Sequence, residues 1–213
     1  MSQPEQTVRP VAVVPAAPAD RDRAARVLAA AFATDAHTVG LLPHGDTDAQ
    51  LFAMFSASVT ERLRTGGQVW LARDPADGRV LGVAMWEAPG EKGSMPARLR
   101  SVVAALRVHR GRICDAMGTN RLADRHRPRV PHWYLAVIGT DPAARGRGAA
   151  SALIRHRLGA ADARGHGTYL ESSTPDNVPI YQRYGFSEIA TVPARGTTPL
   201  IGMWRPPAAP PGG

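Results

Sequence analysis

The chain has 213 residues, of which 44% are hydrophobic and 21% are charged, so its composition fits one folded domain and not a disordered or fibrous chain. The formal net charge is +8, and nearly all of the basic residues are arginine, because Lys92 is the only lysine. One cysteine, Cys114, excludes an intrachain disulfide and a zinc-binding thiolate cluster, and favours a reducing cytoplasm. The longest clean apolar run, Val27–Ala33, is too short for a membrane-spanning helix, so we expect no membrane partner.

The N-terminal part of the chain predicts a strand, two helices and a hairpin. Residues 1–7 are polar and featureless, and we expect them to form a disordered tail. Five segments carry the periodicity of a regular element: a strand at Val8–Val14, a helix from Asp20 to about Phe32, a helix at Thr47–Leu63, and strands at Gln68–Arg73 and Arg79–Trp86. Turn residues join the last two strands, which predicts an antiparallel hairpin.

The next segment is strongly basic. From Pro96 onward, apolar residues recur at helical spacing, and arginines occupy the positions between them. Nine arginines lie from Arg98 to Arg129, with only two acids among them. Such a segment could face nucleic acid, an acidic partner or a phosphorylated ligand. Because no aromatic residues alternate with the arginines, we expect no nucleic-acid partner.

The C-terminal part alternates strands and helices. The expected elements are a strand at Trp133–Thr140, a helix at Ala149–Ala163, a strand at Thr168–Ser172, a short helix at Val178–Tyr184, and strands at Phe186–Val192 and Pro199–Trp204. Hairpins and strand-helix-strand crossovers together predict an α/β (α+β) fold, a mixed sheet with helices on both faces. We expect a single domain over residues 8–205 and a flexible Pro/Gly-rich tail over 206–213.

A glycine-rich turn joins the strand ending at Thr140 to the helix starting near Ala149. Glycines here remove Cβ atoms where a ligand must touch the backbone, and the first amides of the helix point at the same place. Arg145 and Arg147 add charge beside the helix N-terminus, which already favours anions. The turn therefore predicts a phosphate-binding site. Its spacing fits neither the Rossmann fingerprint nor the P-loop.

The run Arg145-Gly146-Arg147-Gly148-Ala149-Ala150 resembles the pyrophosphate loop R/Q-x-x-G-x-G/A of the GCN5-related N-acetyltransferase (GNAT) superfamily, with alanine in place of the commoner second glycine. Downstream, the run from Asn177 through Tyr181 to Gly185-Phe186 resembles that superfamily's other signature. Within the superfamily, the sequence looks closest to puromycin N-acetyltransferase and its actinobacterial relatives. The resemblance implies the GNAT fold, with a mostly antiparallel sheet of six to seven strands.

The resemblance also implies acetyl-CoA as cosubstrate, with no metal. Its pyrophosphate would lie on the amides of Arg145, Gly146, Arg147, Gly148, Ala149 and Ala150, its pantetheine along the backbone at Ile138, Gly139 and Thr140, and Asn177 would also contribute. Gly139 could mark a bulge. In the family the two strands preceding these motifs separate, so that the thioester reaches the acceptor through a V-shaped opening.

Two residues are candidates for catalysis. Tyr181 matches the family's general acid, and its phenol would protonate the leaving thiolate. Glu171, at the end of a strand, either accepts a proton from the acceptor amine or pairs with an arginine, and both interpretations remain open. Trp86, Tyr134 and Glu171 are candidate acceptor-binding residues.

These features predict a cytoplasmic N-acetyltransferase, monomeric or homodimeric, that acts on a primary amine of a small molecule. A role in antibiotic resistance or self-protection would fit. Acetylation of a protein or peptide amine, or a non-catalytic CoA-binding regulatory domain, are the alternatives.

Overall fold

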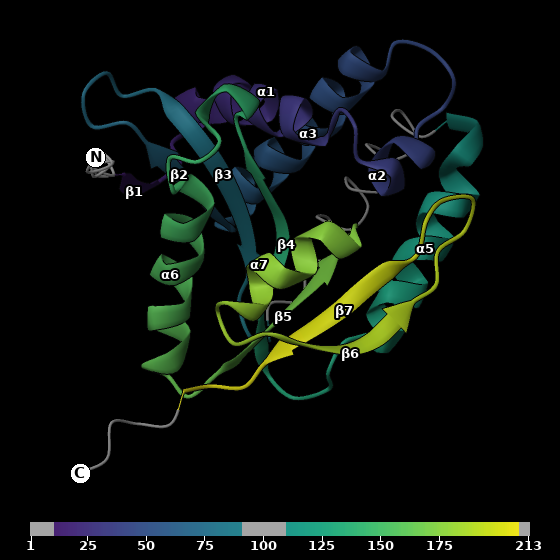
Figure 1. The fold of residues 1–213 in the computed structure, drawn as a ribbon. Helices are drawn as coiled ribbons and strands as arrows, with labels where there is room; N and C mark the ends of the chain where they lie inside the picture. Colours follow the sequence, from purple (N-terminus) through teal and green to yellow (C-terminus); the bar gives the residue numbers. More distant parts are fainter. Residues whose placement is uncertain (1–10, 91–109, 209–213) are drawn as a thin grey trace, which may run out of the picture.

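The computed structural model describes residues 11–90 and 110–208, which form one open sheet with helices on both faces (Figure 1). Seven strands lie in the order β1-β2-β3-β4-β5-β7-β6. They are β1 (Ala12–Pro15), β2 (Gln68–Arg73), β3 (Val80–Glu87), β4 (His132–Thr140), β5 (Gly167–Ser172), β6 (Ser187–Val192) and β7 (Leu200–Arg205). The β4–β5 pair is parallel and the other pairs in this order are antiparallel. The predicted mixed, mostly antiparallel sheet is confirmed.

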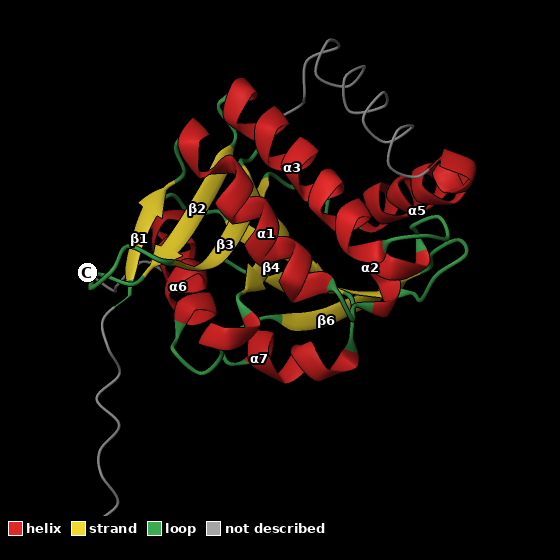
Figure 2. Ribbon diagram, turned by 90° about the horizontal axis from the view of Figure 1, so that it is seen from above, coloured by secondary structure: helices red, strands yellow, loops and turns green. Residues whose placement is uncertain are grey.

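Two layers of helices cover the sheet. The helices are α1 (Arg21–Phe32), α2 (Ala36–Gly40), α3 (Thr47–Thr65), α5 (Ile113–His126), α6 (Ala149–Asp162) and α7 (Val178–Gln182). Seen from above, α1 and α3 lie side by side over β2, β3 and β4 (Figure 2). Apolar side chains of α6 and α7 form a separate cluster on the opposite face. We call these the α1 face and the α6 face of the sheet.

Helices α2 and α3 begin with the same capping interaction. The side chain of Asp35 accepts a hydrogen bond from the amide of Thr38, and that of Asp46 accepts one from the amide of Ala49. Each carboxylate satisfies an amide that has no partner inside its helix. Helix α3 ends at Gly66, whose φ of 75° suits glycine.

The parallel strands β4 and β5 pair only over their first residues. The register runs from His132 opposite Gly167 to Leu135 opposite Leu170, and β4 from Ala136 onward pairs with β3 alone among the described residues. The two strands therefore separate after Leu135 and Leu170, as the family resemblance implied. We call this place the β4–β5 divergence.

A bulge in β4 coincides with this divergence. Opposite Met85 and Trp86 of β3, the register of β4 passes from Val137 to Leu135, so Ala136 is the extra residue. A bulge shifts the alternation of side chains by one. Accordingly Leu135 and Ile138, three residues apart, both pack on the α6 face.

The sequence-based expectations differ from the structure in a few places. Helix α2 was not expected, and Val178–Tyr184 is helical only to Gln182. The helix expected from Pro96 lies partly outside the described residues; within them, α5 extends it to His126. The tail 1–7 and most of the tail 206–213 also lie outside the described residues. Within these residues, no helix is both long and apolar enough to cross a bilayer.

Candidate functional site

A cavity of about 240 Å³ lies at the junction between β4 and α6. We call it the β4–α6 cavity. Its lining contains six of the residues predicted to bind the cosubstrate and two that were not predicted: Thr140, Ala144, Arg145, Gly146, Gly148, Ala149, Ala150 and Ser151. The predicted phosphate loop therefore surrounds a real hollow in the protein.

The backbone of this loop is shaped to receive an anion. Gly146 and Gly148 have φ values of 79° and 80°, a left-handed conformation that glycine adopts without strain. The first bond inside α6 runs from the amide of Ala152 to the carbonyl of Gly148. The amides of the three preceding residues thus have no partner within the helix, and no side chain caps them among the described residues. Free amides at a helix N-terminus form an anion-binding site.

The two arginines of the loop have different surroundings. Arg145 lines the cavity, is exposed and makes no ion pair within the described residues. Arg147 instead donates to the buried carboxylate of Asp74, with Nη2 2.6 Å from Oδ2. This contact holds the loop against the β2–β3 turn. The structure therefore leaves Arg145 free for a phosphate, whereas Arg147 is a structural residue of the loop.

Three other predicted cosubstrate residues lie outside the cavity lining. Ile138 and Gly139 belong to the part of β4 that has no β5 partner, where a strand-like ligand could pair with its backbone. Gly139 does not mark the bulge, which lies at Ala136. A Cβ on Gly139 would lie 2.8 Å from the Cβ of Ala31, so this glycine lets α1 pack closely on β4. Asn177 precedes α7, and within the described residues its side chain makes no capping hydrogen bond to that helix.

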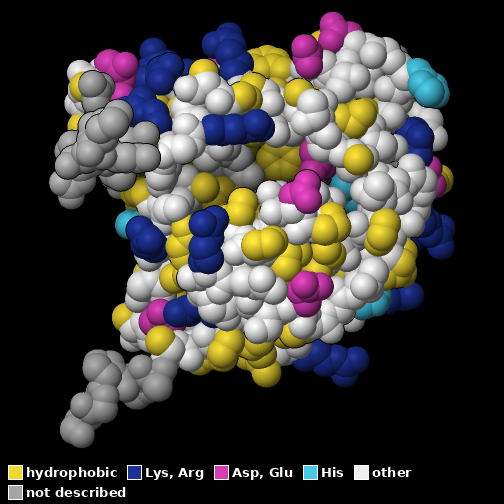
Figure 3. All heavy atoms as spheres, viewed as in Figure 1, with side chains coloured by type: hydrophobic (Ala, Val, Ile, Leu, Met, Phe, Trp, Pro, Cys, Tyr) yellow, Lys and Arg dark blue, Asp and Glu magenta, His cyan; other side chains and the backbone are white. Residues whose placement is uncertain are grey.

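The face that carries these elements is hollowed. Figure 3 shows a depression near its middle, in the area where Figure 1 places β4 between α6 and α7. This is the area of the β4–β5 divergence. A ligand held by the β4–α6 cavity can therefore extend along β4 toward the divergence.

Tyr181 lies beside the divergence. It is 9% exposed and packs in the same apolar cluster as Leu135 and Leu170, with its ring 6.1 Å from that of Phe186. Its hydroxyl has no hydrogen-bond partner among the described residues. The hydroxyl oxygen is nevertheless not among the side-chain atoms that are both unpaired and fully shielded from solvent. The hydroxyl therefore reaches solvent from an otherwise buried ring. Burial, and to a smaller degree the charge of Asp35, raises the pKa of Tyr181 to about 12.

Glu171 lies on the α1 face, opposite Tyr181, because it follows Leu170 along β5. Its side chain is only 5% exposed. The hydroxyl of Tyr134 donates to Oε2 at 2.5 Å, and the Nε of Arg127 lies 3.4 Å from Oε1. Of the two interpretations left open, the structure supports pairing with an arginine.

Further charges extend this group, since Glu87 pairs with Arg127 and also with Arg62, whose Nη2 lies 2.8 Å from its Oε1. We call the group the Glu171 cluster: Arg62, Glu87, Arg127, Tyr134 and Glu171. The guanidinium of Arg127 stacks on the Tyr134 ring at 3.7 Å and also pairs with Glu87 and Asp124. Burial and the charge of Glu171 raise the pKa of Tyr134 well above its ordinary value. The cluster is a compact, mostly neutralised network. Its members come from five separate segments, and only Tyr134 and Glu171 were predicted as site residues.

Trp86, the third candidate for acceptor binding, is fully buried on the α6 face. It presents no surface to an acceptor, and the structure gives it a packing position.

In the described part of the basic segment, which begins at residue 110, Arg127 joins the site region. Arg112 instead donates to the carbonyl of Gly196 and contacts Asp115, and Thr119 of α5 accepts from the amide of Arg195. The described part of this segment thus braces the loop between β6 and β7.

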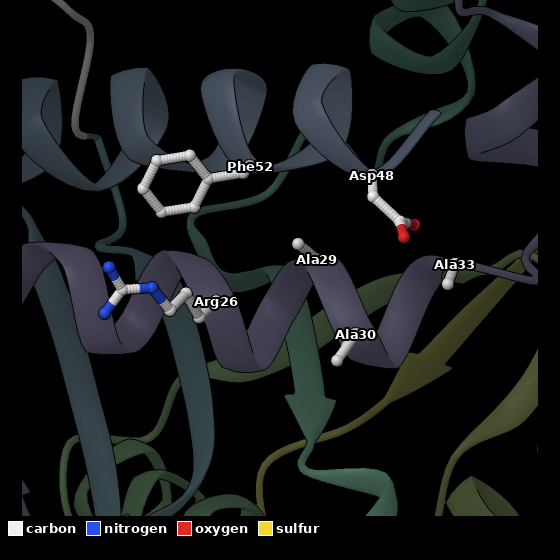
Figure 4. A pocket seen from close by; sticks show the side chains of 6 residues that line it. All are labelled: Arg26, Ala29, Ala30, Ala33, Asp48 and Phe52. Atoms are coloured by element: carbon white, nitrogen blue, oxygen red, sulfur yellow. The ribbon is translucent and has the colours of Figure 1, made fainter. Parts of the chain in front are cut away.

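A second cavity, of about 500 Å³, lies between α1 and α3 (Figure 4). Its lining comprises Arg26, Ala29, Ala30, Ala33, Asp48 and Phe52. The small alanines of α1 create the space, and the guanidinium of Arg26 lies 5.7 Å from the centre of the Phe52 ring. It shares no residue with the β4–α6 cavity.

Ser151 could not be identified from the sequence, although it lines the β4–α6 cavity. Its Oγ accepts a hydrogen bond from the hydroxyl of Tyr184 at 2.6 Å, which ties α6 to the turn that follows α7. Asp35 was also missed. It contacts Ser173 across a sequence separation that no local pattern reveals.

Comparisons with known proteins agree with this geometry. A sequence profile described as the acetyltransferase (GNAT) family matches residues 41–186. The chain is 32% identical to a structure described as histone acetyltransferase HPA2 and related acetyltransferase from Corynebacterium glutamicum, covering 94% of this chain and 98% of that one with a TM-score of 0.73.

More distant structures share the fold. A mosquito arylalkylamine N-acetyltransferase-like protein is 12% identical with a TM-score of 0.56, covering 92% of this chain and 100% of that one. The ribosomal-protein-S18-alanine N-acetyltransferase from Escherichia coli is 14% identical with a TM-score of 0.54, covering 94% and 96%.

Proposed function

Because the chain belongs to the acetyltransferase (GNAT) family, we propose that it transfers the acetyl group of acetyl-CoA to a primary amine of a small molecule. The observation that carries this proposal is the position of Tyr181. Its hydroxyl reaches solvent beside the β4–β5 divergence, without a partner among the described residues, on the same face as the β4–α6 cavity. The glycine-rich loop, the β4–β5 divergence and the Tyr181 hydroxyl thus lie on one face of the sheet, as acetyl transfer from CoA would require.

The proposed reaction converts an ammonium ion and a thioester into an amide and a thiol. The ammonium form of the acceptor first releases a proton, and the neutral nitrogen attacks the thioester carbonyl. A carbon–nitrogen bond forms and the carbon–sulfur bond breaks, so that an amide and a CoA thiolate result. The nitrogen loses a second proton, and the thiolate gains one. One proton is released overall.

Tyr181 suits the thiolate side of this reaction. Its pKa of about 12 keeps the phenol protonated at neutral pH, so it can donate a hydrogen bond to sulfur. Complete transfer of its proton to a thiolate of ordinary pKa would be uphill by on the order of 5 kcal/mol. Tyr181 therefore stabilises the departing thiolate as a donor, and the proton leaving the nitrogen completes the exchange.

The α1 face supports a small acceptor. Helix α2 is tied to the β6–β7 loop, since the Oγ1 of Thr197 donates to the carbonyls of Ala36 and His37, and a ring nitrogen of His37 bonds to the carbonyl of Thr198 at 2.7 Å. A Cβ on Gly40 would lie 2.4 Å from the Thr197 Oγ1, so glycine permits this close contact. This bridge fixes α2 beside the end of β5, where Asp35 contacts Ser173. A fixed loop on this side favours a small acceptor over a protein.

Acylation of a protein amine is the second candidate, because the relative with 32% identity is described as a histone acetyltransferase and related acetyltransferase. A panel of acceptors separates the two. It contains puromycin, tyramine, spermidine and glycinamide, together with a lysine-rich basic peptide and a peptide with N-terminal alanine. Free thiol is detected from acetyl-CoA, and mass spectrometry identifies the product.

We expect turnover of at least one small amine and none of either peptide. Acetylation of peptides alone would replace the small acceptor by a protein. Absence of thiol release with every amine, in a protein that binds acetyl-CoA, would support a non-catalytic CoA-binding domain and overturn the proposal.

A further inference from the structure

Asp35 lies where α1 gives way to α2, next to the end of β5. Its Oδ1 accepts the amide of Thr38 at 2.8 Å, and its Oδ2 accepts the hydroxyl of Ser173 at 2.5 Å. Ser173 directly follows the last residue of β5. The side chain of Asp35 therefore joins the α1–α2 junction to the strand that borders the β4–β5 divergence.

Asp35 is held at the end of β5 through Ser173, and Leu170 of the same strand packs in the apolar cluster that contains Tyr181. The charge of Asp35 also contributes to the raised pKa of that phenol. Asp35 comes from the α1 face of the sheet, whereas Tyr181 packs on the α6 face. The two groups thus approach the divergence from opposite sides, which are the sides of the acceptor and of the thiol.

Asp35 has no cationic partner among the described residues. By contrast, Glu87, Glu171 and Asp162, which are also partly or largely buried, each pair with an arginine. Both bonds to Asp35 come from neutral donors, and a carboxylate accepts up to about four. A partly buried anion with spare acceptor capacity attracts a cation.

We propose that Asp35 binds the ammonium group of the acceptor at the β4–β5 divergence, held in position by Ser173. The inference rests on the proposed function and specifies its substrate class, an aliphatic amine that is protonated in solution. Glu171 does not take this role, because Arg127 already supplies a cation to its carboxylate and its side chain is only 5% exposed. Acetylation turns the ammonium into a neutral amide, so the product loses this attraction and leaves.

Asp35→Asn tests the charge with little change of shape. The amide oxygen of asparagine can still cap Thr38 or accept from Ser173. Asp46→Asn is the matched control, because Asp46 caps α3 in the same way through the amide of Ala49 but lies on an exposed turn. For each variant, kcat and KM are measured with the panel amine of highest kcat/KM, and the dissociation constant of acetyl-CoA is measured in parallel.

We expect Asp35→Asn to raise the KM of the amine roughly 10- to 150-fold, the range for loss of a hydrogen bond to a charged group. The kcat at saturating amine and the affinity for acetyl-CoA should stay close to those of the parent, as should all constants of Asp46→Asn. In the presence of CoA, calorimetry should show that the parent binds the amine more tightly than its N-acetyl product. The variant should bind the two alike.

An unchanged KM, with the amine still preferred over its product, would overturn the role of Asp35 while leaving the proposed function intact. If the parent turns over no amine, the proposed function itself fails and the inference fails with it. If Asp35→Asn does not fold, Ser173→Ala decides the matter. This variant keeps the charge of Asp35 but removes the hydrogen bond from Ser173 that holds its carboxylate in position. The KM of the amine should therefore rise by a smaller factor than in Asp35→Asn. An unchanged KM would overturn the proposal.

Discussion

Replacing Tyr181 by Phe removes one hydroxyl and keeps the ring. The ring packs against Phe186 in a buried cluster, whereas the hydroxyl has no partner among the described residues. Removing an unpartnered hydroxyl loses no protein hydrogen bond, so the free energy of unfolding should stay within about 1 kcal/mol of the parent. Tyr181→Ala would instead leave a cavity and cost about 3–5 kcal/mol.

The rate of acetyl transfer should fall strongly on Tyr181→Phe, although the stability should hardly change. A hydrogen bond to a charged group contributes about 1.5–3 kcal/mol, which corresponds to roughly 10- to 150-fold in rate. Full general acid catalysis can contribute roughly 10²- to 10⁴-fold. Because a pKa of about 12 makes complete proton transfer from Tyr181 uphill, we expect a loss of kcat near the overlap of these ranges, roughly 100-fold.

The assay is single-turnover release of thiol from enzyme saturated with acetyl-CoA, which isolates the chemical step from product release. Affinity for acetyl-CoA, measured separately, should not change. A Tyr181→Phe protein that releases thiol at the parent rate would refute the donor role, and water or another group would then have to stabilise the thiolate. A matching loss of stability and cosubstrate affinity would point to packing instead.

The raised pKa of Tyr181 also predicts the behaviour of the enzyme at high pH. Ionisation of this phenol should not lower kcat between about pH 8 and pH 10, and a decline there that disappears in Tyr181→Phe would contradict the assignment. The unfolded chain, with an ordinary tyrosine pKa of 10.0, releases this proton first. The free energy of unfolding should therefore fall as pH rises from about 10 toward 12, and Tyr181→Phe should reduce that fall, as denaturant titrations can show.

Two further predictions concern the loop and the Glu171 cluster. Acetyl-CoA at 100 times its dissociation constant should stabilise the parent by about 2.7 kcal/mol in thermal melts. Gly148→Glu should abolish this shift, while Gly165→Glu, with a similarly positive φ of 66° in open space away from the cavity, should retain it. Arg127→Ala should lower the free energy of unfolding by about 3 kcal/mol, because it leaves the charge of Glu171 buried without its partner. The exposed Arg129→Ala should change stability little in the same urea titrations, and equal effects of both arginines would contradict the pairing argument.

The sequence was most informative where a local pattern determines the geometry. The glycines at 146 and 148 and the apolar runs on either side sufficed to predict a strand, an anion-binding turn and a helix in that order. The role of Arg147 could not be predicted, since its partner Asp74 lies in a hairpin turn 73 residues away. Basic residues near a phosphate loop look alike in sequence, and only the fold separates the free arginine from the paired one.

The bulge at Ala136 explains why the acceptor side was harder to predict than the cosubstrate side. Along an unbroken strand, alternate side chains share a face, but the extra residue moves Ile138 to the face already occupied by Leu135. Tyr134, before the bulge, lies on the α1 face of the sheet and joins Glu171, whereas Leu135 packs in the same cluster as Tyr181. The divergence begins at this same residue, so one irregularity both opens the sheet and determines which side chains meet on each side of it. The acceptor groups come from distant segments that this geometry brings together, and Asp35 joins them only because α1 ends beside β5.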